Sequence, residues 1–155
     1  MKGPAFQSDA AKAKLLQVAR SWIGTPFRKG ASIKGAGVDC VNLAASIYTE
    51  SGFYVSRSFP GYSLDEGSHS TKSKIETWLK LSADRFEEVV DFGIGDLLVF
   101  KMGFVTHHVG VMITNSTFIN AMKGYGVVEL NIEDRTWARR LQSAHRPIEV
   151  YLSPA

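Results

Sequence analysis

The sequence predicts an α+β domain, with helices in the first part of the chain and antiparallel strands in the second. Apolar residues recur at helical spacing before residue 52, whereas the runs after residue 85 are short, rich in β-branched and aromatic residues, and separated by Gly, Asn and Asp. This segregation favours an α+β arrangement over an alternating α/β one. A length of 155 residues is typical of one domain, so we expect a single domain over residues 1–155.

Three helices are expected. Residues 8–23 and 40–51 each carry an apolar face at helical spacing, and Asp39 is a suitable N-cap for the second helix. Residues 53–70 are turn-rich, and residues 72–81 predict a short third helix. The inward-facing residues are expected to be Leu15, Val18, Ala19 and Trp22, then Cys40, Leu43, Ala44, Ile47 and Tyr48, then Ile75, Trp78 and Leu79.

The strands are expected to be consecutive and antiparallel. Each run has the residue types that strands favour, and turn residues stand between the runs. The expected strands are "FEEVV" (86–90), "DLLVFK" (96–101), "HVGVMI" (108–113), "STFINA" (116–121), "GVVEL" (126–130) and a last one at "PIEVYL" (147–152).

Cys40, the only cysteine of the chain, follows a long glycine-rich loop, "GTPFRKGASIKGAGVD" (24–39). A compact domain rarely carries such a loop without a purpose. A helix N-terminus lowers the pKa of a thiol, and the backbone N–H of Cys40 could donate to an oxyanion. The alternative is a packing role, because Cys40 shares a helix face with Leu43 and Ile47. Catalysis would also need a base.

Among the four histidines, His108 is the best candidate base. It opens a strand whose alternation places Gly110 beside it on one face and β-branched residues on the other. A three-residue tip at 114–116 would pair Ile113 with Thr117 and bring Asn120 diagonal to His108, where its amide could fix the imidazole tautomer. A two-residue tip would reverse this facing, and an Asn satisfied by backbone groups is the plain alternative.

The other histidines and the loop do not indicate a cofactor. His69 and His145 are interpreted as exposed structural residues, and His107 points to the opposite face from His108, so a zinc site lacks paired ligand spacing. The loop has neither phosphate-loop spacing nor a Lys-Ser/Thr ending. We therefore expect no metal and no cofactor.

Composition and charge exclude several classes of protein. With 45% hydrophobic and 21% charged residues and no long apolar run, membrane insertion is not expected. The net charge of +3 comes from scattered residues, densest at "RKG" (28–30) and "WARR" (137–140), which we interpret as solvated surface; no nucleic-acid partner is expected. The start "MKGPAFQSDAAKAK" shows no secretory signal, and one cysteine leaves the redox compartment open.

The quoted pieces together resemble the NlpC-type cysteine peptidases, papain-like enzymes that act on bacterial cell-wall peptides. They occur in the family's order, from about residue 12 to 122: "ARSWIGTPFRKGA", "GVDCVNLAASIY", "GDLLVF", "HHVGVMI" and "FINA". The resemblance implies a papain-like fold with N-terminal helices packed on a central antiparallel β-sheet. It also implies a cell-wall hydrolase of bacterial or phage origin.

The resemblance assigns the three chemical roles. It implies Cys40 as nucleophile, His108 as general base and acid, and Asn120 as the residue that orients His108. The implied reaction is hydrolysis of an amide in the stem peptide of peptidoglycan, commonly the bond between D-glutamate and a diamino acid, through a thioester. The substrate-binding or oxyanion region would then comprise Phe27, Asp39, Val41 and His107.

The sequence departs from the family pattern at three places. Phe27 stands where many members have a Tyr thought to bind the oxyanion, which leaves the second donor unidentified. "DCVN" replaces the common "DCSG", so Val41 and Asn42 change the surroundings of the nucleophile, and Asn120 replaces a frequent His. With Asn120 in place of His, the sequence also resembles the related CHAP-type amidases.

Two rival functions stay open: a CHAP-like amidase that cuts between muramic acid and the first alanine, and an inactive binding domain of the same fold with an unreactive thiol. We expect a monomer that acts on peptidoglycan peptides in the periplasm or cell wall, although no signal peptide is visible. Relatives on phage tails and gene-transfer particles suggest a phage-tail or secretion-system partner as a delivery route.

Overall fold

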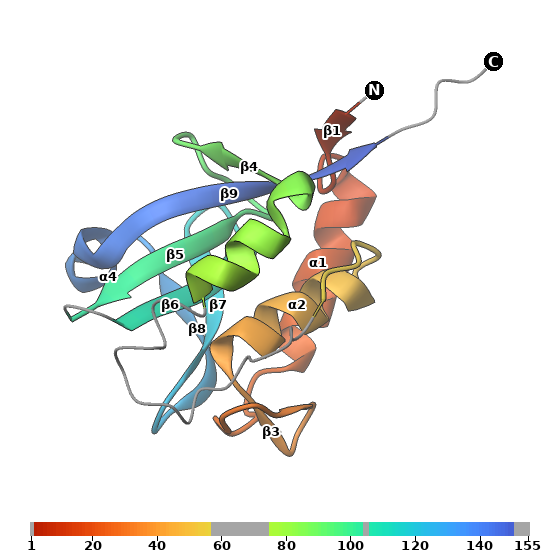
Figure 1. Cartoon of the computed structure of the whole chain (residues 1–155). Coiled ribbons are helices and arrows are strands. Elements are labelled where there is room, and N and C mark those ends of the chain that lie inside the picture. The colour runs from red at the N-terminus through yellow and green to blue at the C-terminus, as the bar shows by residue number, and fades with distance from the viewer. Residues whose placement is uncertain (1, 57–74, 104–105, 151–155) are drawn as a thin grey trace.

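The computed structural model describes residues 2–56, 75–103 and 106–150, and shows helices packed on an antiparallel sheet (Figure 1). The sheet order is β1-β9-β5-β6-β7-β8, with β4 also paired to β9, and a separate small sheet joins β2 and β3. The predicted α+β class is confirmed. The elements are β1 (Lys2–Pro4), α1 (Asp9–Ser21), β2 (Ser32–Ile33), β3 (Gly37–Val38), α2 (Cys40–Glu50), η1 (Ala83–Arg85), β4 (Phe86–Val89), β5 (Leu97–Met102), β6 (Thr106–Met112), β7 (Thr117–Met122), β8 (Gly126–Asn131), α4 (Arg135–Arg140) and β9 (Leu141–Val150).

The first two helices form as their sequences predict. The Ser8 side chain caps α1 by accepting from the N–H of Ala11, and the Asp39 side chain caps α2 by accepting from the N–H of Asn42. Both caps satisfy N–H groups that the helix itself leaves free. Residues 75–81 are helical, but the start of the predicted third helix and the segment 57–74, which includes His69, lie outside the described residues.

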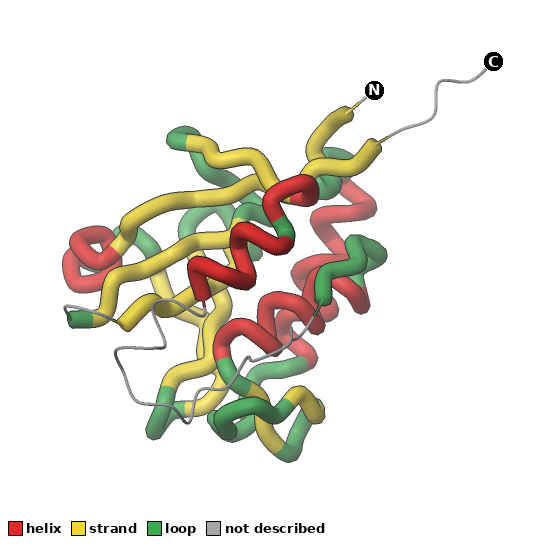
Figure 2. Tube along the Cα trace, in the orientation of Figure 1, coloured by secondary structure: helices red, strands yellow, loops and turns green. Residues whose placement is uncertain are grey.

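The predicted strands form, and five further short elements in the described residues were not predicted (Figure 2). The new elements are β1, the β2–β3 pair, η1 and α4. Each has six residues or fewer, which is too short for a period to be recognised. Lys2 of β1 pairs with the distant Val150, whereas β2 and β3 pair with each other. The last strand begins at Leu141, six residues before its predicted start.

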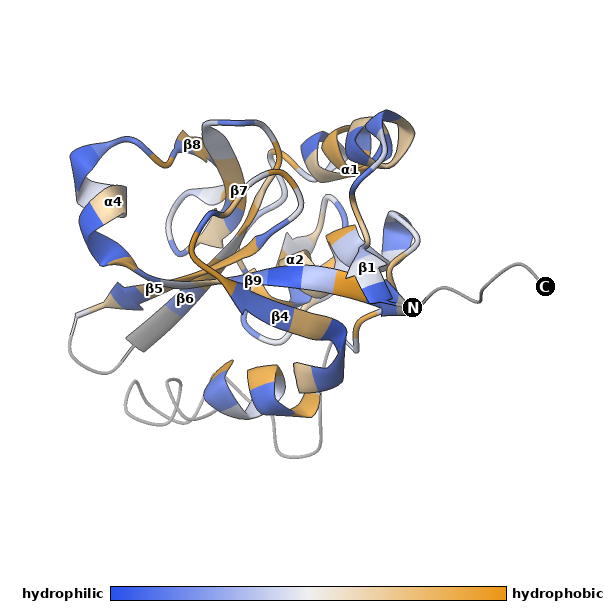
Figure 3. Ribbon diagram, turned by 90° about the horizontal axis from the view of Figure 1, so that it is seen from above, coloured by the Kyte–Doolittle hydropathy of each residue, from blue (hydrophilic) through white to orange (hydrophobic). Residues whose placement is uncertain are grey.

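The sheet has an apolar cluster on each face. Val109 and Val111 of β6 belong to the larger cluster, which lies under α1 and α2, whereas Met112 belongs to a smaller cluster with Phe118 and Trp137. Alternate residues of a strand point to opposite faces, so α4 lies on the face away from α1 and α2. Figure 3 accordingly shows α4 and α1 at opposite ends of the view from above.

A buried ion pair joins β9 to the turn before β5. The carboxylate of Asp96, which is 1% exposed, accepts from Arg146 Nε at 3.2 Å and from Arg146 Nη2 at 2.9 Å. It also accepts from the N–H of Gly93 at 2.8 Å. The turn includes the first two residues of the "GDLLVF" piece (95–100). Because Asp96 is bound by Arg146 and Gly93, its role is structural.

Arg146→Met should destabilise the fold strongly, because it leaves the buried carboxylate of Asp96 without its cation. Loss of one partner of a buried pair costs about 3–5 kcal/mol, and we expect a decrease of that order in the free energy of unfolding, measured in urea. The matched control is Arg20→Met, which breaks an exposed pair with Glu129. Equal losses in the two variants would contradict this role of Asp96.

Candidate active site

Asp39 ties the glycine-rich loop to the start of α2. Its buried carboxylate accepts from the N–H of Gly30 at 2.8 Å, from the N–H of Asn42 at 2.8 Å and from Asn42 Nδ2 at 3.1 Å. The Asn42 amide also donates to the carbonyl of Ala31 at 3.2 Å. The loop therefore has a defined path, and Cys40 is held as the first residue of α2.

The earlier part of the loop is held between β8 and β3. Gly24 donates to the carbonyl of Val127 at 3.2 Å, Val127 donates back to Thr25 at 2.9 Å, and Phe27 forms a bridge with Val38. Gly126 is required here, because it has a φ of 77° and a Cβ would lie 2.6 Å from the carbonyl oxygen of Thr25. The close approach fixes the segment that leads to Cys40.

The thiol of Cys40 is buried, with 7% of the residue exposed. Burial, and secondly the charge of Asp39, raise the pKa of Cys40 to about 12, although the N–H groups of Val109, Val41 and Cys40 itself act in the opposite direction. The net pKa is therefore raised rather than lowered, although the N–H groups at the start of the helix act in the predicted direction. Desolvation outweighs the helix N–H groups, and the resting thiol is protonated at neutral pH.

His108 and Asn120 meet as the three-residue hairpin tip predicts. Ile113 donates to the carbonyl of Thr117 at 3.0 Å, and the register continues through Met112 opposite Phe118. His108 Nε2 lies 2.7 Å from Asn120 Oδ1, and Asn120 Nδ2 donates to Val128 at 3.2 Å. Because the amide nitrogen of Asn120 donates to the carbonyl of Val128, its amide oxygen is the atom that accepts from His108 Nε2. The other ring nitrogen of His108, Nδ1, is then the basic one.

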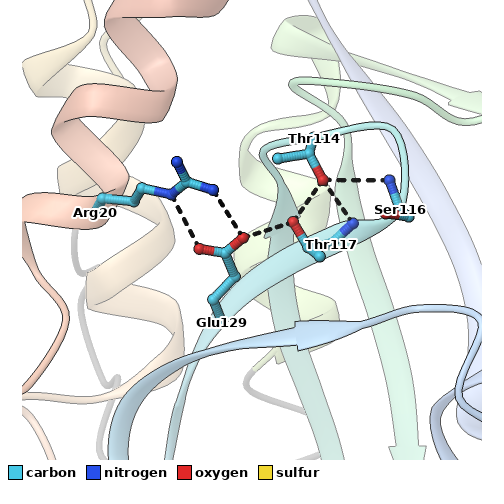
Figure 4. Close-up of polar contacts among 5 residues, drawn as sticks. All are labelled: Arg20, Thr114, Ser116, Thr117 and Glu129. Atoms are coloured by element: carbon cyan, nitrogen blue, oxygen red, sulfur yellow. Dashed lines mark hydrogen bonds and ion pairs between the residues drawn. The ribbon is translucent and has the colours of Figure 1, made fainter.

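The hairpin tip is anchored to α1 (Figure 4). Arg20 donates from Nε to Glu129 Oε1 at 3.0 Å and from Nη2 to Oε2 at 3.1 Å. Thr117 donates to Glu129 at 2.8 Å, and Thr114 accepts from the N–H groups of Ser116 and Thr117. These contacts hold β7 and β8 together, and the two strands carry Asn120 and the carbonyl that orients it.

The His108 imidazole is buried in an aromatic environment. Its centroid lies 6.2 Å from that of Phe100 and 5.9 Å from that of Trp137. Burial lowers the pKa of His108, the hydrogen bond that its Nε2 donates to Asn120 raises it, and the positive charge of Arg140 lowers it. The net effect is a lowered pKa, so the ring is neutral at neutral pH.

Cys40 reaches β6 beside His108. The N–H of Val109, the next residue after His108, donates to the thiol. That N–H is available because, in the described residues, the β6–β7 ladder consists of the pairs Val111–Ile119 and Met112–Phe118 and stops before Val109. No hydrogen bond joins the sulfur to His108 itself in the described structure.

The remaining predicted residues take different positions. Phe27 is half-buried against the core, and the Val41 side chain is fully buried, so Val41 can offer a substrate only its backbone N–H. His107 lies in β6, but its side chain is outside the described structure. His145, predicted to be exposed, is half-buried and forms a hydrogen bond of 2.9 Å with the hydroxyl of Ser143.

In the described part of the chain, no three His, Cys, Asp or Glu side chains gather closely enough to hold a metal ion.

Trp137 and Arg140 next to His108 were not identified from the sequence as site residues. The cluster "WARR" gave the only signal, since residues three apart share a helix face. Gly110 leaves room for a neighbour, and Phe118 fills it, since its Cδ2 would lie 2.8 Å from a Cβ at this position.

Comparison with known proteins decides the family. The family model described as NlpC/P60 matches residues 24–146, which include the loop, Cys40, the His108 strand and Asn120. The chain belongs to the NlpC/P60 family.

Curated relatives share this family. The NlpC/P60 chain is 29% identical over 137 residues to the murein DD-endopeptidase MepS/murein LD-carboxypeptidase of Escherichia coli strain K12, covering 87% of this chain and 62% of the relative. It is 30% identical over 129 residues to the protein named probable endopeptidase NlpC of the same strain, covering 82% and 72%. The chain thus spans less than two thirds of MepS.

Solved structures confirm the papain-like α+β fold of the family. An NLP/P60 protein described as similar to lipoprotein, from Staphylococcus aureus, matches with a TM-score of 0.67 and 19% identity, covering 96% of this chain and 45% of that one. An NlpC protein from Trichomonas vaginalis matches with a TM-score of 0.64 and 17% identity, covering 94% and 50%. None of the described helices of the NlpC/P60 chain has the length and apolar character to cross a membrane.

Proposed function

We propose that this NlpC/P60 chain hydrolyses amide bonds in peptidoglycan stem peptides, with Cys40 as nucleophile, His108 as base and acid, and Asn120 as the residue that orients His108. The observation that carries the proposal is the 2.7 Å contact between His108 Nε2 and Asn120 Oδ1, on the strand whose Val109 N–H contacts the thiol. The endopeptidase and murein names of the relatives support the substrate class.

The pKa shifts favour a mechanism that starts from two neutral groups. A thiol with a pKa of about 12 is not a thiolate at rest, so its proton passes to Nδ1 of His108 as the sulfur attacks the carbonyl carbon. The imidazolium then gives this proton to the leaving amine as the C–N bond breaks, which leaves a thioester on Cys40. Water, deprotonated by the neutral ring, attacks the thioester and releases the acid and the thiol.

Two backbone N–H groups are proposed as donors to the oxyanion, and that of Val41 is shared with the carboxylate of Asp39. The N–H groups of Cys40 and Val41 open α2 and lie beside the sulfur. The first N–H groups of a helix have no partner within the helix and suit a developing negative charge. In this proposal, they replace the Tyr hydroxyl that is lost at Phe27, while Asp39 holds the loop in place.

The lowered pKa of His108 predicts the acid limb of the pH profile. The base must be neutral, and its pKa lies below the ordinary value of 6.5, so kcat/KM at pH 6.5 should still exceed half of its plateau and should fall below half only at lower pH. Steady-state rates on a muropeptide of constant charge between pH 4 and 8 measure this. A half-maximal rate above pH 6.5 on the acid side would contradict it.

The bond between D-glutamate and a diamino acid is the first candidate for cleavage. A second candidate is a bond between two D-residues, because the relative MepS is named a DD-endopeptidase. The test is incubation with a monomeric and a cross-linked muropeptide, followed by mass analysis. Cleavage after D-glutamate leaves a dipeptide on the sugar, whereas cleavage between D-residues separates the dimer into monomers.

The same products separate the remaining alternatives. A CHAP-like amidase would release an intact stem peptide from its sugar, and an inactive domain would leave every substrate unchanged. Alkylation of the thiol, by contrast, is a poor test, because a buried thiol with a pKa of about 12 reacts slowly whether or not it is catalytic.

A further inference from the structure

The short helix α4 packs its two inward residues around the candidate base. Trp137 is 7% exposed and lies in an aromatic cluster, with its centroid 5.1 Å from Phe100, 5.3 Å from Phe118 and 5.9 Å from His108. The guanidinium carbon of Arg140 lies over the Trp137 ring, 5.1 Å from its centroid. We call Trp137 and Arg140 the α4 pair.

Among the described residues, the charge of Arg140 has no acidic partner. The described arginines of α1 and β9 that reach a carboxylate do so at close range, Arg20 to Glu129 at 3.0 Å and Arg146 to Asp96 at 2.9 Å. No carboxylate lies within ion-pair distance of Arg140 among the described residues. Arg140 stacks on the indole of Trp137, which attracts the guanidinium but carries no charge that would neutralise it. The positive charge of Arg140 therefore still disfavours protonation of His108.

The α4 segment is itself firmly placed. The Asp134 side chain caps it by accepting from the N–H of Thr136 at 2.9 Å, and its last residue is followed directly by β9 at Leu141. Ile132 and Trp137 are both buried in the smaller apolar cluster. The helix therefore holds the α4 pair at a fixed position against β5 and β6.

We propose that Trp137 and Arg140 are positioning residues for His108: the indole holds the plane of the imidazole, and the guanidinium keeps the ring in its uncharged form between turnovers. The role of His108 as base rests on the proposed function, but the effect of the α4 pair on the ring does not. The catalytic consequence is a ring that is oriented toward Asn120 and ready to accept the proton of Cys40.

Within residues 2–56, 75–103 and 108–149, few groups are placed to act on His108. Arg140 faces it from α4 and the Cys40 thiol approaches its strand from α2, while β5 and β7 contribute Phe100 and Asn120, which do not titrate in this range. Burial and the charge of Arg140 lower the pKa of His108, and the hydrogen bond to Asn120 opposes them. Removal of the Arg140 charge should therefore raise this pKa.

The first experiment is an NMR titration of the folded protein labelled with ¹³C-histidine, which needs no substrate. Arg140→Gln should shift the titration midpoint of His108 upward, and Arg140→Lys should restore it most of the way. The control variant is Arg139→Gln, an exposed arginine on the same helix. The internal control is His145, whose pKa is lowered by burial and raised by Glu88, without a contribution from Arg140.

The second experiment tests the indole. Trp137→Leu keeps an apolar side chain but removes the ring, and should speed the solvent exchange of the His108 Nε2 proton and lower kcat about tenfold or more with little change in KM. Trp137→Phe should retain most of the wild-type behaviour. If Trp137→Leu does not fold, the Arg140 titration decides the proposal alone.

The outcomes separate this inference from the proposed function. An unchanged His108 midpoint in Arg140→Gln would overturn the inference, even if the wild type hydrolyses peptidoglycan. A higher KM in that variant with an unchanged midpoint would also overturn it, since Arg140 would then bind substrate. The expected shift in a protein that cleaves no muropeptide would support the inference while the proposed function fails.

Discussion

Replacing Cys40 with alanine should abolish cleavage of every muropeptide that the wild type cleaves, a loss of roughly ten-thousand-fold or more in kcat. The reason is that the proposed acyl intermediate forms on Cys40, the one cysteine of the chain, which lies at the start of α2 against β6. Product formation is measured by liquid chromatography with mass detection, at enzyme concentrations high enough to detect a single turnover.

Two controls make this result specific. Cys40→Ala should keep its fold, because it removes only one buried sulfur, and its thermal unfolding should confirm this. Cys40→Ser keeps an atom that accepts from the N–H of Val109 but replaces the thiol with a poorer nucleophile, so it should be nearly as inactive. Cleavage of muropeptides by Cys40→Ala at the wild-type rate would contradict the cysteine mechanism.

Replacing His108 with alanine should lower kcat by about 10²–10⁴-fold, the usual contribution of a general acid and base. The residual activity should also lose the acid limb of its pH profile, because the group that titrates is gone. The matched control is His145→Ala on β9, a half-buried histidine that contacts Ser143 and lies away from the hairpin. Equal losses of activity in His108→Ala and His145→Ala would contradict a catalytic role of His108, because the loss would then follow from removing a histidine side chain from the sheet.

The long helices were predictable because local rules determine them, whereas the hairpin register was left open between two tip lengths. Ser8 and Asp39 are good N-caps in front of periodic apolar runs, and both cap their helices. The polar tip between Ile113 and Thr117 was one of two options, and the structure has the three-residue form. That choice places Asn120 at His108 and could not have been settled by the strand pattern alone, since either tip preserves the alternation.

The surroundings of the site were less predictable because they depend on contacts distant in the sequence. Nothing near Cys40 in the chain shows that its thiol will be buried against Val109, yet this burial reverses the expected direction of its pKa shift. Trp137 lies far from His108 in the sequence and belongs to a six-residue helix without a recognisable period. The span of residues 1–155 as one domain stays a prediction.

The most direct test of the central claim, that the sulfur of Cys40 carries the acyl part of the substrate, is intact-protein mass spectrometry of acid-quenched turnover mixtures. The account predicts a mass increase equal to the acyl fragment of the cleaved muropeptide, mapped to Cys40 by digestion and removed by hydroxylamine. An adduct mapped to another residue, or cleavage by the Cys40→Ala variant at the wild-type rate, would contradict it.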